Sequence, residues 1–579
     1  MNAELLGVIV MFVATLLLSV PLGRYIAKVY AGDKVWTDAI LNPVERLFFK
    51  LSRINPAREM NWKQHLIALL TINLVWFLWA MFCLLNQSWL PWNPDHNPSQ
   101  TPDLAFNTAV SFLVNCNLQD YSGETGASYF TQVFGFMFLQ FTSAATGMAA
   151  AAIVFNALRD RTTEKLGNFY NYFLKSITRI LVPICIIVAT LHAFHGTPMT
   201  FKGIDTVTSL QGDTMHVSRG PVAAFVAIKH LGTNGGGFYG ANSAHPLENP
   251  DYFTNTVQMI IQILIPFAMV FAFGYYLRKK RLAWVFWAVM TIGFLCLVIP
   301  AINAEIHGNP KIAQMGISQP SGNMEGKEVR FGSYASAFWS IATTVISTGS
   351  VNAMHDSFMP ISGMNMLLGM MVNSFYGGVG VGFLNFFIYV ILAVFMGGLM
   401  VGRTPEFMGK KIEAREMKIA MIVALLHPFL ILAFTAVASH FTALNTNMGW
   451  WFADAAGKHN ASGWLNNPSY HGFSEMLYQY TSCSANNGSG FEGLADNNPF
   501  WNITAGIVLL FSRFLPIIGP IAIAGLMAGK KFIPESSGTL KTDTGTFGIL
   551  VFAVKVIIAA LAFFPALALG PIAEFFSMK

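Results

Sequence analysis

The chain has 579 residues, of which 54% are hydrophobic and only 11% are charged, and its formal net charge is +6. Soluble domains carry about a quarter charged residues, so this composition excludes an ordinary soluble protein. Apolar runs of about 20 residues, the length that crosses a hydrocarbon core, recur along the chain. The sequence therefore predicts an all-α polytopic membrane protein that resides in a lipid bilayer.

Ten membrane spans are expected. Arg24 and Lys28 follow the first apolar run and no basic residue precedes it, which is typical of a retained span with its N-terminus outside rather than of a cleaved signal peptide. An even number of spans places the C-terminus outside as well. The spans lie near residues 3–25, 65–85, 129–155, 172–194, 253–277, 282–303, 362–402, 416–441, 497–528 and 545–570.

The connecting segments differ in charge. Most Lys and Arg residues lie near 24–63, 159–165, 278–281, 403–418 and 530–531, which are therefore predicted to be cytoplasmic. This orientation signal accounts for most of the net charge, so no nucleic-acid partner is expected. The alternative for RKKR at 278–281 is a site for anionic lipid. The outside segments, 86–128, 195–252, 304–361 and 442–496, are longer and rich in Gly, Asn, Ser and Pro.

Each outside segment contains a short apolar stretch followed at once by small and amide residues. The stretches are too short to span and predict re-entrant helices. They occupy residues 104–114, 221–232, 334–346 and 473–484, and the residues that follow read NCNLQ, TNGGGF, STGSVN and NNGSGF. Two of these ends share the pattern N-G-x-G-F-x-G, in TNGGGFYG at 233–240 and NNGSGFEG at 486–493.

Regular spacing indicates four copies of one unit. The third loop positions, Asn117, Gly235, Gly349 and Gly488, are 118, 114 and 139 residues apart. The predicted organisation is an N-terminal extra span with a cytoplasmic loop at 1–60, pore units at 61–160, 161–280, 281–412 and 413–530, and a C-terminal extra span at 531–579.

Four non-helical loops at membrane depth must line a wet cavity or be buried in protein. Glycine lets such a loop turn its carbonyls inward, and a ring of inward carbonyls holds a dehydrated monovalent cation. The short helices would also direct their negative C-terminal dipoles at the same point. Because no ring of Asp or Glu accompanies the loops, a divalent ion is disfavoured and K+ is the expected ligand. The alternative is that these are ordinary extracellular turns.

At these residues the sequence resembles the potassium-binding, channel-like subunit of the Kdp-type potassium-importing P-type ATPases. The resemblance runs along the whole chain and rests on YSGETG, GANSAHPLENP, VNAMHDS, GGVGVG at 377–382, GRTPEF at 402–407 and FSRFLPIIGPIAIAG at 511–525. It implies the potassium-channel and potassium-transporter superfamily fold, K+ as the transported ion, and a place in the bacterial cytoplasmic (inner) membrane. It also implies two kinds of partner, a catalytic P-type ATPase subunit and small single-span accessory subunits.

The resemblance also implies the ion-binding residues. Gln119 matches a position just above the first loop, and Cys116, Leu118 and Asn373 stand where the family often carries Thr, Trp and Glu. The implied filter rows are Asn115, Cys116 and Asn117; Thr233, Asn234 and Gly235; Ser347, Thr348 and Gly349; and Asn486, Asn487 and Gly488.

The apolar run at 361–401 is about twice the length of one span. Its glycines, Gly377, Gly378, Gly380 and Gly382, predict a helix broken by a loop that blocks the way below the filter, the alternative being a close helix contact. Arg513, at mid-depth, would repel an ion moving straight to the cytoplasm, unless it extends to the interface. Lys555, nearer the cytoplasmic end of the last span, is expected to extend to the interface.

No catalytic motif is expected in this chain. KTDTGT at 541–546 resembles the phosphorylation sequence of P-type pumps, but Thr544 stands where that motif has Lys, and GLMAGKK at 525–531 does not match a phosphate-binding loop. ATP hydrolysis would therefore belong to a partner subunit. The alternatives are a stand-alone potassium channel or cation-coupled symporter of the same superfamily and, less in keeping with 13 scattered His residues, a haem or metal redox protein.

Overall fold

The computed structural model describes residues 3–159, 162–400, 402, 404–444, 451, 461–534 and 540–578. Parts of the loops expected at 159–165, 403–418 and 442–496 lie outside these ranges. In the described residues, ten helical segments are long and apolar enough to cross a membrane, and they coincide with the expected spans. They are Glu4–Ala31, Trp62–Asn86, Thr131–Arg159, Phe169–Phe194, Tyr252–Tyr276, Lys280–Gln314, Val381–Met400, Ala414–Leu444, Pro499–Ala528 and Gly545–Ser577. The all-α polytopic fold is confirmed.

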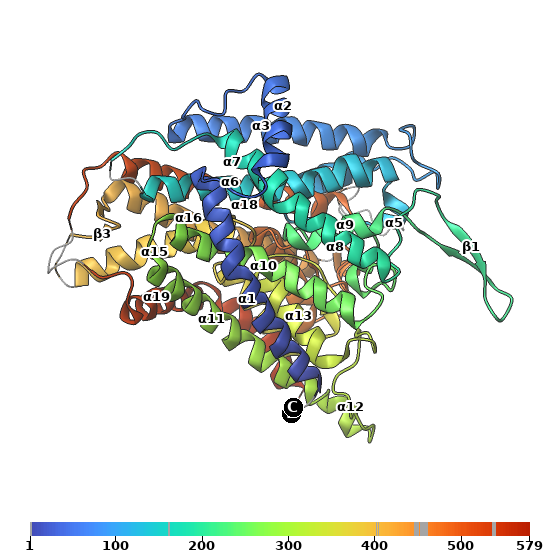
Figure 1. Cartoon of the computed structure of the whole chain (residues 1–579). Coiled ribbons are helices and arrows are strands. Elements are labelled where there is room, and N and C mark those ends of the chain that lie inside the picture. Colours follow the sequence, from blue (N-terminus) through green and yellow to red (C-terminus); the bar gives the residue numbers. More distant parts are fainter. Residues whose placement is uncertain are drawn as a thin grey trace.

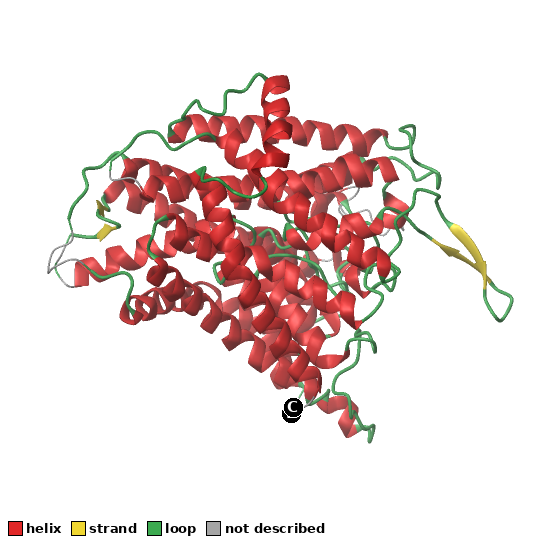
Figure 2. Ribbon diagram, viewed as in Figure 1, coloured by secondary structure: helices red, strands yellow, loops and turns green. Residues whose placement is uncertain are grey.

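Most spans are single α-helices, and some contain a π-helical turn (Figures 1 and 2). The spanning elements are α1 (Ala3–Ala31), α3 (Trp62–Asn86), η1 (Thr131–Met137) with α6 (Phe138–Arg159), α7 (Phe169–Lys175) with η2 (Ser176–Leu181) and α8 (Val182–Phe194), α10 (Tyr252–Tyr276), α11 (Lys280–Ile306), α15 (Val381–Met400), α16 (Ala414–Leu444), α18 (Pro499–Ala528), and α19 (Gly545–Leu567) with η7 (Ala568–Ile572) and α20 (Ala573–Ser577). Short helices α2 (Asp38–Ser52), α5 (Gly123–Gly126) and α12 (Pro310–Gln314) lie in connections.

The run expected as one broken helix is two helices. α14 (Pro360–Val372) ends at Asn373, which has a φ of 42°, and α15 begins at Val381. Within the loop, Gly377, Gly378 and Gly380 have φ values of 45°, 77° and 79°. This left-handed backbone is one that glycine adopts without the cost other residues incur, so the glycine cluster ends the helix.

Four short helices occupy the positions predicted for re-entrant segments. They are α4 (Pro102–Leu113), α9 (Val222–Leu231), α13 (Gly332–Val345) and α17 (Tyr470–Ala485). Nearly every residue of α9 and α13 is buried. Because these helices are too short to span and are enclosed by the spans, their C-terminal ends lie inside the protein.

The protein interior centres on α6 and α10. In their most apolar windows 89% of residues are buried, compared with 22% for α1, which lies at the periphery against α10. α6 contains Gly147 and the run Ala149 to Ala152, whose small side chains allow neighbouring backbones to approach closely. The small hairpin β1 (Asp205–Thr208) and β2 (Thr214–Val217) projects from the helical body (Figures 1 and 2). A second hairpin pairs β3 (Glu406–Phe407) with β4 (Lys410–Lys411).

An ion-pair cluster fixes α2 to the spans. Arg179 of η2 is buried, and its Nε lies 2.6 Å from Glu45 Oε1 while its Nη1 lies 2.5 Å from Asp38 Oδ1. Its Nη2 also donates to Asn42 Oδ1 at 2.7 Å. One guanidinium therefore binds three side chains of α2, in the bidentate geometry that suits Arg.

We expect Arg179→Ala to lower the free energy of unfolding by about 3–5 kcal/mol, because Glu45 is left buried without its charge partner. Thermal unfolding of the detergent-solubilised protein measures the change. Arg46→Ala is the matched control, because the Arg46 side chain is exposed and donates to the Asn42 carbonyl of its own helix, with no carboxylate partner among the described residues. Equal melting temperatures for the two variants would contradict this role of Arg179.

Candidate ion-binding site

The four short helices end in the same backbone turn. The second residue of each following loop donates its N–H to the carbonyl five residues earlier, and the first residue is left-handed, as in a Schellman cap. The N–H of Cys116 donates to the Ser111 carbonyl at 3.0 Å. The equivalent bonds, each 2.9 Å long, run from Asn234 to Lys229, from Thr348 to Thr343 and from Asn487 to Ser482. The first residues, Asn115, Thr233, Ser347 and Asn486, have φ values of 64°, 48°, 55° and 52°.

The third residue of every loop is also left-handed. Asn117, Gly235, Gly349 and Gly488 have φ values of 58°, 83°, 86° and 101°. In each loop the N–H of the second residue is bound to the preceding short helix, whereas the carbonyl of that residue points away from the helix. The carbonyls of Cys116, Asn234, Thr348 and Asn487 accept no hydrogen bond from any described residue. A buried carbonyl without a donor, repeated in four loops, is a site that favours a cation.

The loops lie side by side in a closed ring. A Cβ placed on Gly235 would lie 1.9 Å from Thr348 O, one on Gly349 2.0 Å from Asn487 O, and one on Gly488 1.9 Å from Cys116 O. The third residue of each of these loops therefore contacts the middle carbonyl of the next loop. Asn115 Nδ2 donates to Thr233 O at 2.8 Å and joins the first loop to the second. The twelve expected filter residues are thus brought together.

Side chains of α6 support the ring from behind. Ser143 Oγ donates to Asn115 Oδ1 at 2.8 Å and to Asn234 Oδ1 at 3.1 Å, and Gln140 Nε2 donates to Asn117 Oδ1 at 2.9 Å. Sequence reasoning missed these residues. The signal that could have revealed them is that Gln140 and Ser143 are polar residues within an apolar span. Because they lie three positions apart, they face the same side of the helix.

Gln119 joins the first two loops just beyond the ring. Its Oε1 accepts the N–H of Gly237 at 2.7 Å, and its Nε2 donates to the Gly237 carbonyl at 3.0 Å. The side chain thus forms a two-point clamp. In this structure Gln119 fixes the position of the second loop relative to the first through the backbone of Gly237.

Acidic residues lie beyond the ring on the expected outer side. Asn107 Nδ2 donates to Asp120 Oδ2 at 2.6 Å, and Gln479 Nε2 donates to Asp496 Oδ2 at 3.0 Å. Burial raises the pKa of Asp120 well above its ordinary value, and the adjacent Asp496 carboxyl raises it further. Burial also raises the pKa of Asp496 to about 6. Two carboxyls this close disfavour simultaneous ionisation.

The loop of the broken helix contacts the other side of the ring. The Val379 N–H donates to Thr233 Oγ1 at 2.9 Å, and Ser347 Oγ donates to Asn373 Oδ1 at 3.2 Å. At Gly380, a Cβ would lie 2.1 Å from the Gly147 carbonyl of α6. Gly377, Gly378 and Gly380 thus lie in the segment next to the ring. Gly382 is the second residue of α15 and lies against the Tyr376 and Gly377 carbonyls.

Two buried cationic side chains lie on this side. Arg513 is 4% exposed and its Nη2 donates to the Ser143 carbonyl at 3.1 Å, so it does not extend to the interface. Lys555 is 1% exposed, and its ammonium donates to the Ser374 carbonyl at 2.8 Å and lies 4.0 Å from the Phe375 ring centroid. The expectation that Lys555 reaches the interface was wrong, because the broken-helix loop supplies a carbonyl and an aromatic face inside the protein.

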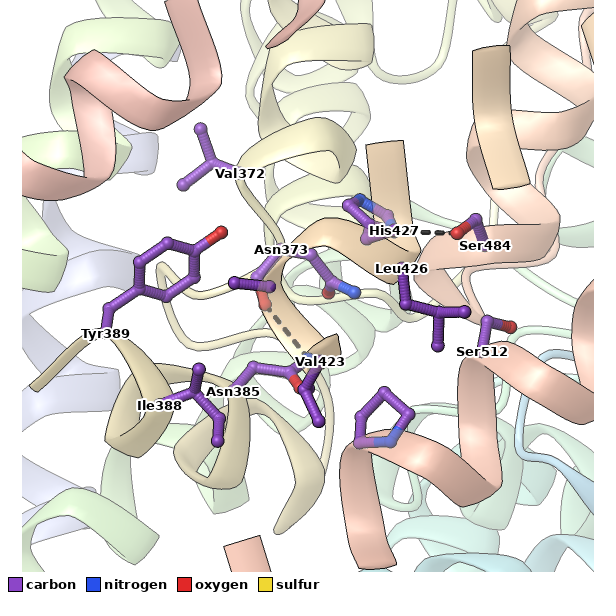
Figure 3. A pocket seen from close by; sticks show the side chains of 12 residues that line it. Val372, Asn373, Asn385, Ile388, Tyr389, Val423, Leu426, His427, Ser484 and Ser512 are labelled. Atoms are coloured by element: carbon purple, nitrogen blue, oxygen red, sulfur yellow. Dashed lines mark hydrogen bonds between the residues drawn. The ribbon is translucent and has the colours of Figure 1, made fainter. Parts of the chain in front are cut away.

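A cavity of about 30 Å³ lies between the broken helix and α16, α17 and α18 (Figure 3). Its polar lining includes Asn373, Asn385, His427, Ser484 and Ser512. His427 Nδ1 lies 2.7 Å from Ser484 Oγ, and Asn385 Nδ2 donates to the Asn373 carbonyl at 3.2 Å. This volume has room for a water molecule or a bare monovalent ion. Of these residues only Asn373 was singled out from the sequence.

Ten spans and four re-entrant helices that converge on a ring of carbonyls define a channel-like membrane transport protein. The sequence model of the potassium-transporting ATPase A subunit family matches residues 9–576. The chain belongs to this family.

Relatives match the chain over nearly its whole length. The chain is 69% identical to a potassium-transporting ATPase potassium-binding subunit of Flavobacterium johnsoniae over 100% of both chains. It is 58% identical to one of Phocaeicola vulgatus, also over 100% of both, and 49% identical to one of Alicyclobacillus acidocaldarius over 98% of both. The crystal structure of the potassium transporter TrkH from Vibrio parahaemolyticus is similar with a TM-score of 0.48 and 14% identity, over 90% of this chain and 98% of that one.

We expect Thr233→Val to release the loop of the broken helix from the ring. The Val379 N–H loses a buried acceptor, which costs about 1–3 kcal/mol, so its hydrogen exchange accelerates by roughly tenfold or more. Exchange mass spectrometry of a peptide containing Val379 measures this. The control is Thr343→Val, because the Thr343 hydroxyl is buried and has no hydrogen-bond partner among the described residues. Unchanged exchange in Thr233→Val would show that this bond does not hold the loop.

Proposed function

We propose that this chain binds K+ from the outside at the four-loop ring and passes it to a catalytic P-type ATPase subunit. The observation that carries the proposal is the set of four middle carbonyls, each without a hydrogen-bond donor in the described part of the chain, although the N–H of the same residue is bound. The relatives are named potassium-binding subunits of a potassium-transporting ATPase, which supports the same ligand. The proposed ligand rows are Asn115–Asn117, Thr233–Gly235, Ser347–Gly349 and Asn486–Gly488.

The ring chemistry favours K+ over divalent ions. Carbonyl oxygens replace the hydration shell of a monovalent cation, and the C-terminal ends of α4, α9, α13 and α17 add negative potential. The twelve filter residues include no Asp or Glu, the ligands that hard divalent ions prefer. Because the ligand at Cys116 is its backbone carbonyl, the Cys side chain preserves the site.

The loop at 373–380 is proposed to block the way below the ring. Thr233 and Ser347 each belong to a filter row and also bond this loop, so the ring and the barrier share side chains. Arg513 adds positive charge beside α6, which disfavours a cation continuing straight through the chain. The ion is therefore proposed to leave sideways, and the cavity beside Asn373 and His427 lies next to the barrier.

We also propose that a partner ATPase subunit hydrolyses ATP and that small single-span accessory subunits belong to the same complex. The complex is placed in the bacterial cytoplasmic (inner) membrane with both termini of this chain outside. The even number of spans supports termini on one side, and the Lys and Arg distribution supports the orientation.

We expect Gly235→Ala to weaken K+ binding by about tenfold or more, equivalent to about 1.4 kcal/mol. The added Cβ would lie 1.9 Å from Thr348 O at a φ of 83°, so the adjacent loop must move. Rubidium uptake by cells that lack other potassium uptake systems, expressing the whole complex, gives the apparent affinity. The control is Gly545→Ala, where a Cβ meets no atom within 4 Å.

Wild-type affinity in Gly235→Ala would refute the ring assignment. The same cells separate the proposal from a stand-alone channel or symporter, because uptake by the proposed complex ceases when the ATPase subunit is omitted. Uptake by the chain alone would favour the channel or symporter.

We expect Arg513→Gln to increase passive K+ flux through the complex in liposomes without ATP, because a buried charge beside the ring is lost. The guanidinium pairs with no carboxylate among the described residues, so its field is not cancelled locally. Arg46→Gln, an exposed change on α2, serves as control. Passive flux equal to that of the wild type would show that Arg513 is not part of the barrier.

A further inference from the structure

A second cluster of ligand-type side chains lies away from the ring, beside the third and fourth loops. His471 of α17 has its Nε2 2.8 Å from Asp356 Oδ1 and its Nδ1 2.8 Å from Glu574 Oε1. Asp356 lies in the short helix η4 (His355–Ser357), which follows the third loop, and Glu574 lies in α20. The imidazole therefore joins three segments that are far apart in the sequence.

Glu475 adds a buried carboxylate with a free oxygen. It lies four residues after His471 and so shares a face of α17 with it. Its Oε1 accepts the Asn467 N–H at 3.1 Å and Asn467 Nδ2 at 3.2 Å. Its Oε2 has no hydrogen-bond partner among the described residues, and because the residue is 0% exposed, bulk water does not reach this oxygen either. An unpartnered buried carboxylate oxygen costs free energy unless a ligand satisfies it.

These side chains meet the geometric requirement for one ion. Asp356, His471 and Glu475 each offer one ligand atom, and the three atoms lie within 4.8 Å of one another. Glu574 occupies the other ring nitrogen of His471. Metal-binding His residues almost always donate that second N–H to a carboxylate, which fixes the ring and leaves the opposite nitrogen for the metal.

The cluster has access and suitable charge. Asp356, His471 and Glu574 line a cavity of about 520 Å³, which also includes Glu325 and contains no Lys or Arg among its described lining residues. Around one imidazole there are three carboxylates, so the local charge is negative. One His nitrogen with carboxylate oxygens is a donor set of Zn²⁺ and related divalent transition ions, not of K+.

The geometry points to a binding site for a divalent transition-metal ion, of the Zn²⁺ class, formed by Asp356, His471 and Glu475 and oriented by Glu574. The ion replaces the contact between His471 Nε2 and Asp356 Oδ1, and the Nε2 proton leaves to solvent on binding. It connects the fourth short helix to the segment after the third loop. A Cβ on Gly493, at the end of the NNGSGFEG sequence, would lie 2.6 Å from Glu475 Oε1, so the site adjoins the fourth loop. This site is independent of the proposed K+ ring.

The test is Zn²⁺ binding to the purified full complex in mild detergent, measured by calorimetry and by metal content after desalting. Wild type is expected to retain Zn²⁺ stoichiometrically, His471→Ala and Glu475→Gln to lose it, and Glu574→Gln to bind about 10–100-fold more weakly. His195→Ala is the matched control, because His195 also pairs with a carboxylate, Asp251 at 2.6 Å, but lies outside the cluster. It is expected to bind as wild type does.

Cobalt(II) gives a readout that does not depend on transport. Bound Co²⁺ is expected to produce visible absorption in wild type and His195→Ala but not in Glu475→Gln, which keeps the Oε1 contacts with Asn467. Glu475→Gln thus remains informative even if His471→Ala does not fold. Wild-type Zn²⁺ retention by Glu475→Gln, loss in His195→Ala alone, or only weak unsaturable uptake by wild type would each overturn the assignment.

Discussion

The structure depends on one constraint, that backbone leaving a helix inside a membrane protein must find partners for its polar groups. Each short helix meets it with the same cap, in which the second loop amide returns to the helix and the first residue becomes left-handed. The second-residue amide is then bound to its own helix in each loop, while the carbonyl of the same residue accepts no hydrogen bond from the residues that the structure describes. Four such ends placed together gather backbone oxygens without any acidic side chain.

The rest of the fold keeps those ends in place. From α6, Ser143 and Gln140 donate hydrogen bonds to the side-chain amide oxygens of Asn residues in the first two loops. Gly147 of the same helix allows the broken-helix loop to approach within van der Waals distance of its backbone. Because Thr233 and Ser347 bond both the ring and that loop, movement of either segment affects the other. The ring and the broken-helix loop are therefore joined by direct hydrogen bonds.

Charge is distributed unequally on the two sides of the ring. Asp120 and Asp496 lie on one side, and the buried cations Arg513 and Lys555 lie on the other. Negative charge on the acidic side chains attracts a cation, and positive charge on Arg513 repels one. Burial of Arg513 reduces the screening of its charge by water. This arrangement is consistent with an ion that enters from outside and does not continue straight through.

The ten spans, the four short helices and the break after Val372 were predictable from the sequence, because apolar length, loop composition and glycine content act locally. The grouping of the four loops also followed from their spacing and shared residues. Sequence alone did not indicate that Ser143 and Gln140 hold the loops, that Lys555 contacts the Ser374 carbonyl, or that His471 and Glu475 meet Asp356. Those contacts join residues 23 to 181 positions apart in the sequence, so only tertiary packing decides them. Local hydrophobicity and backbone preference set the elements, whereas the partner of each buried polar group is chosen by which helices pack together.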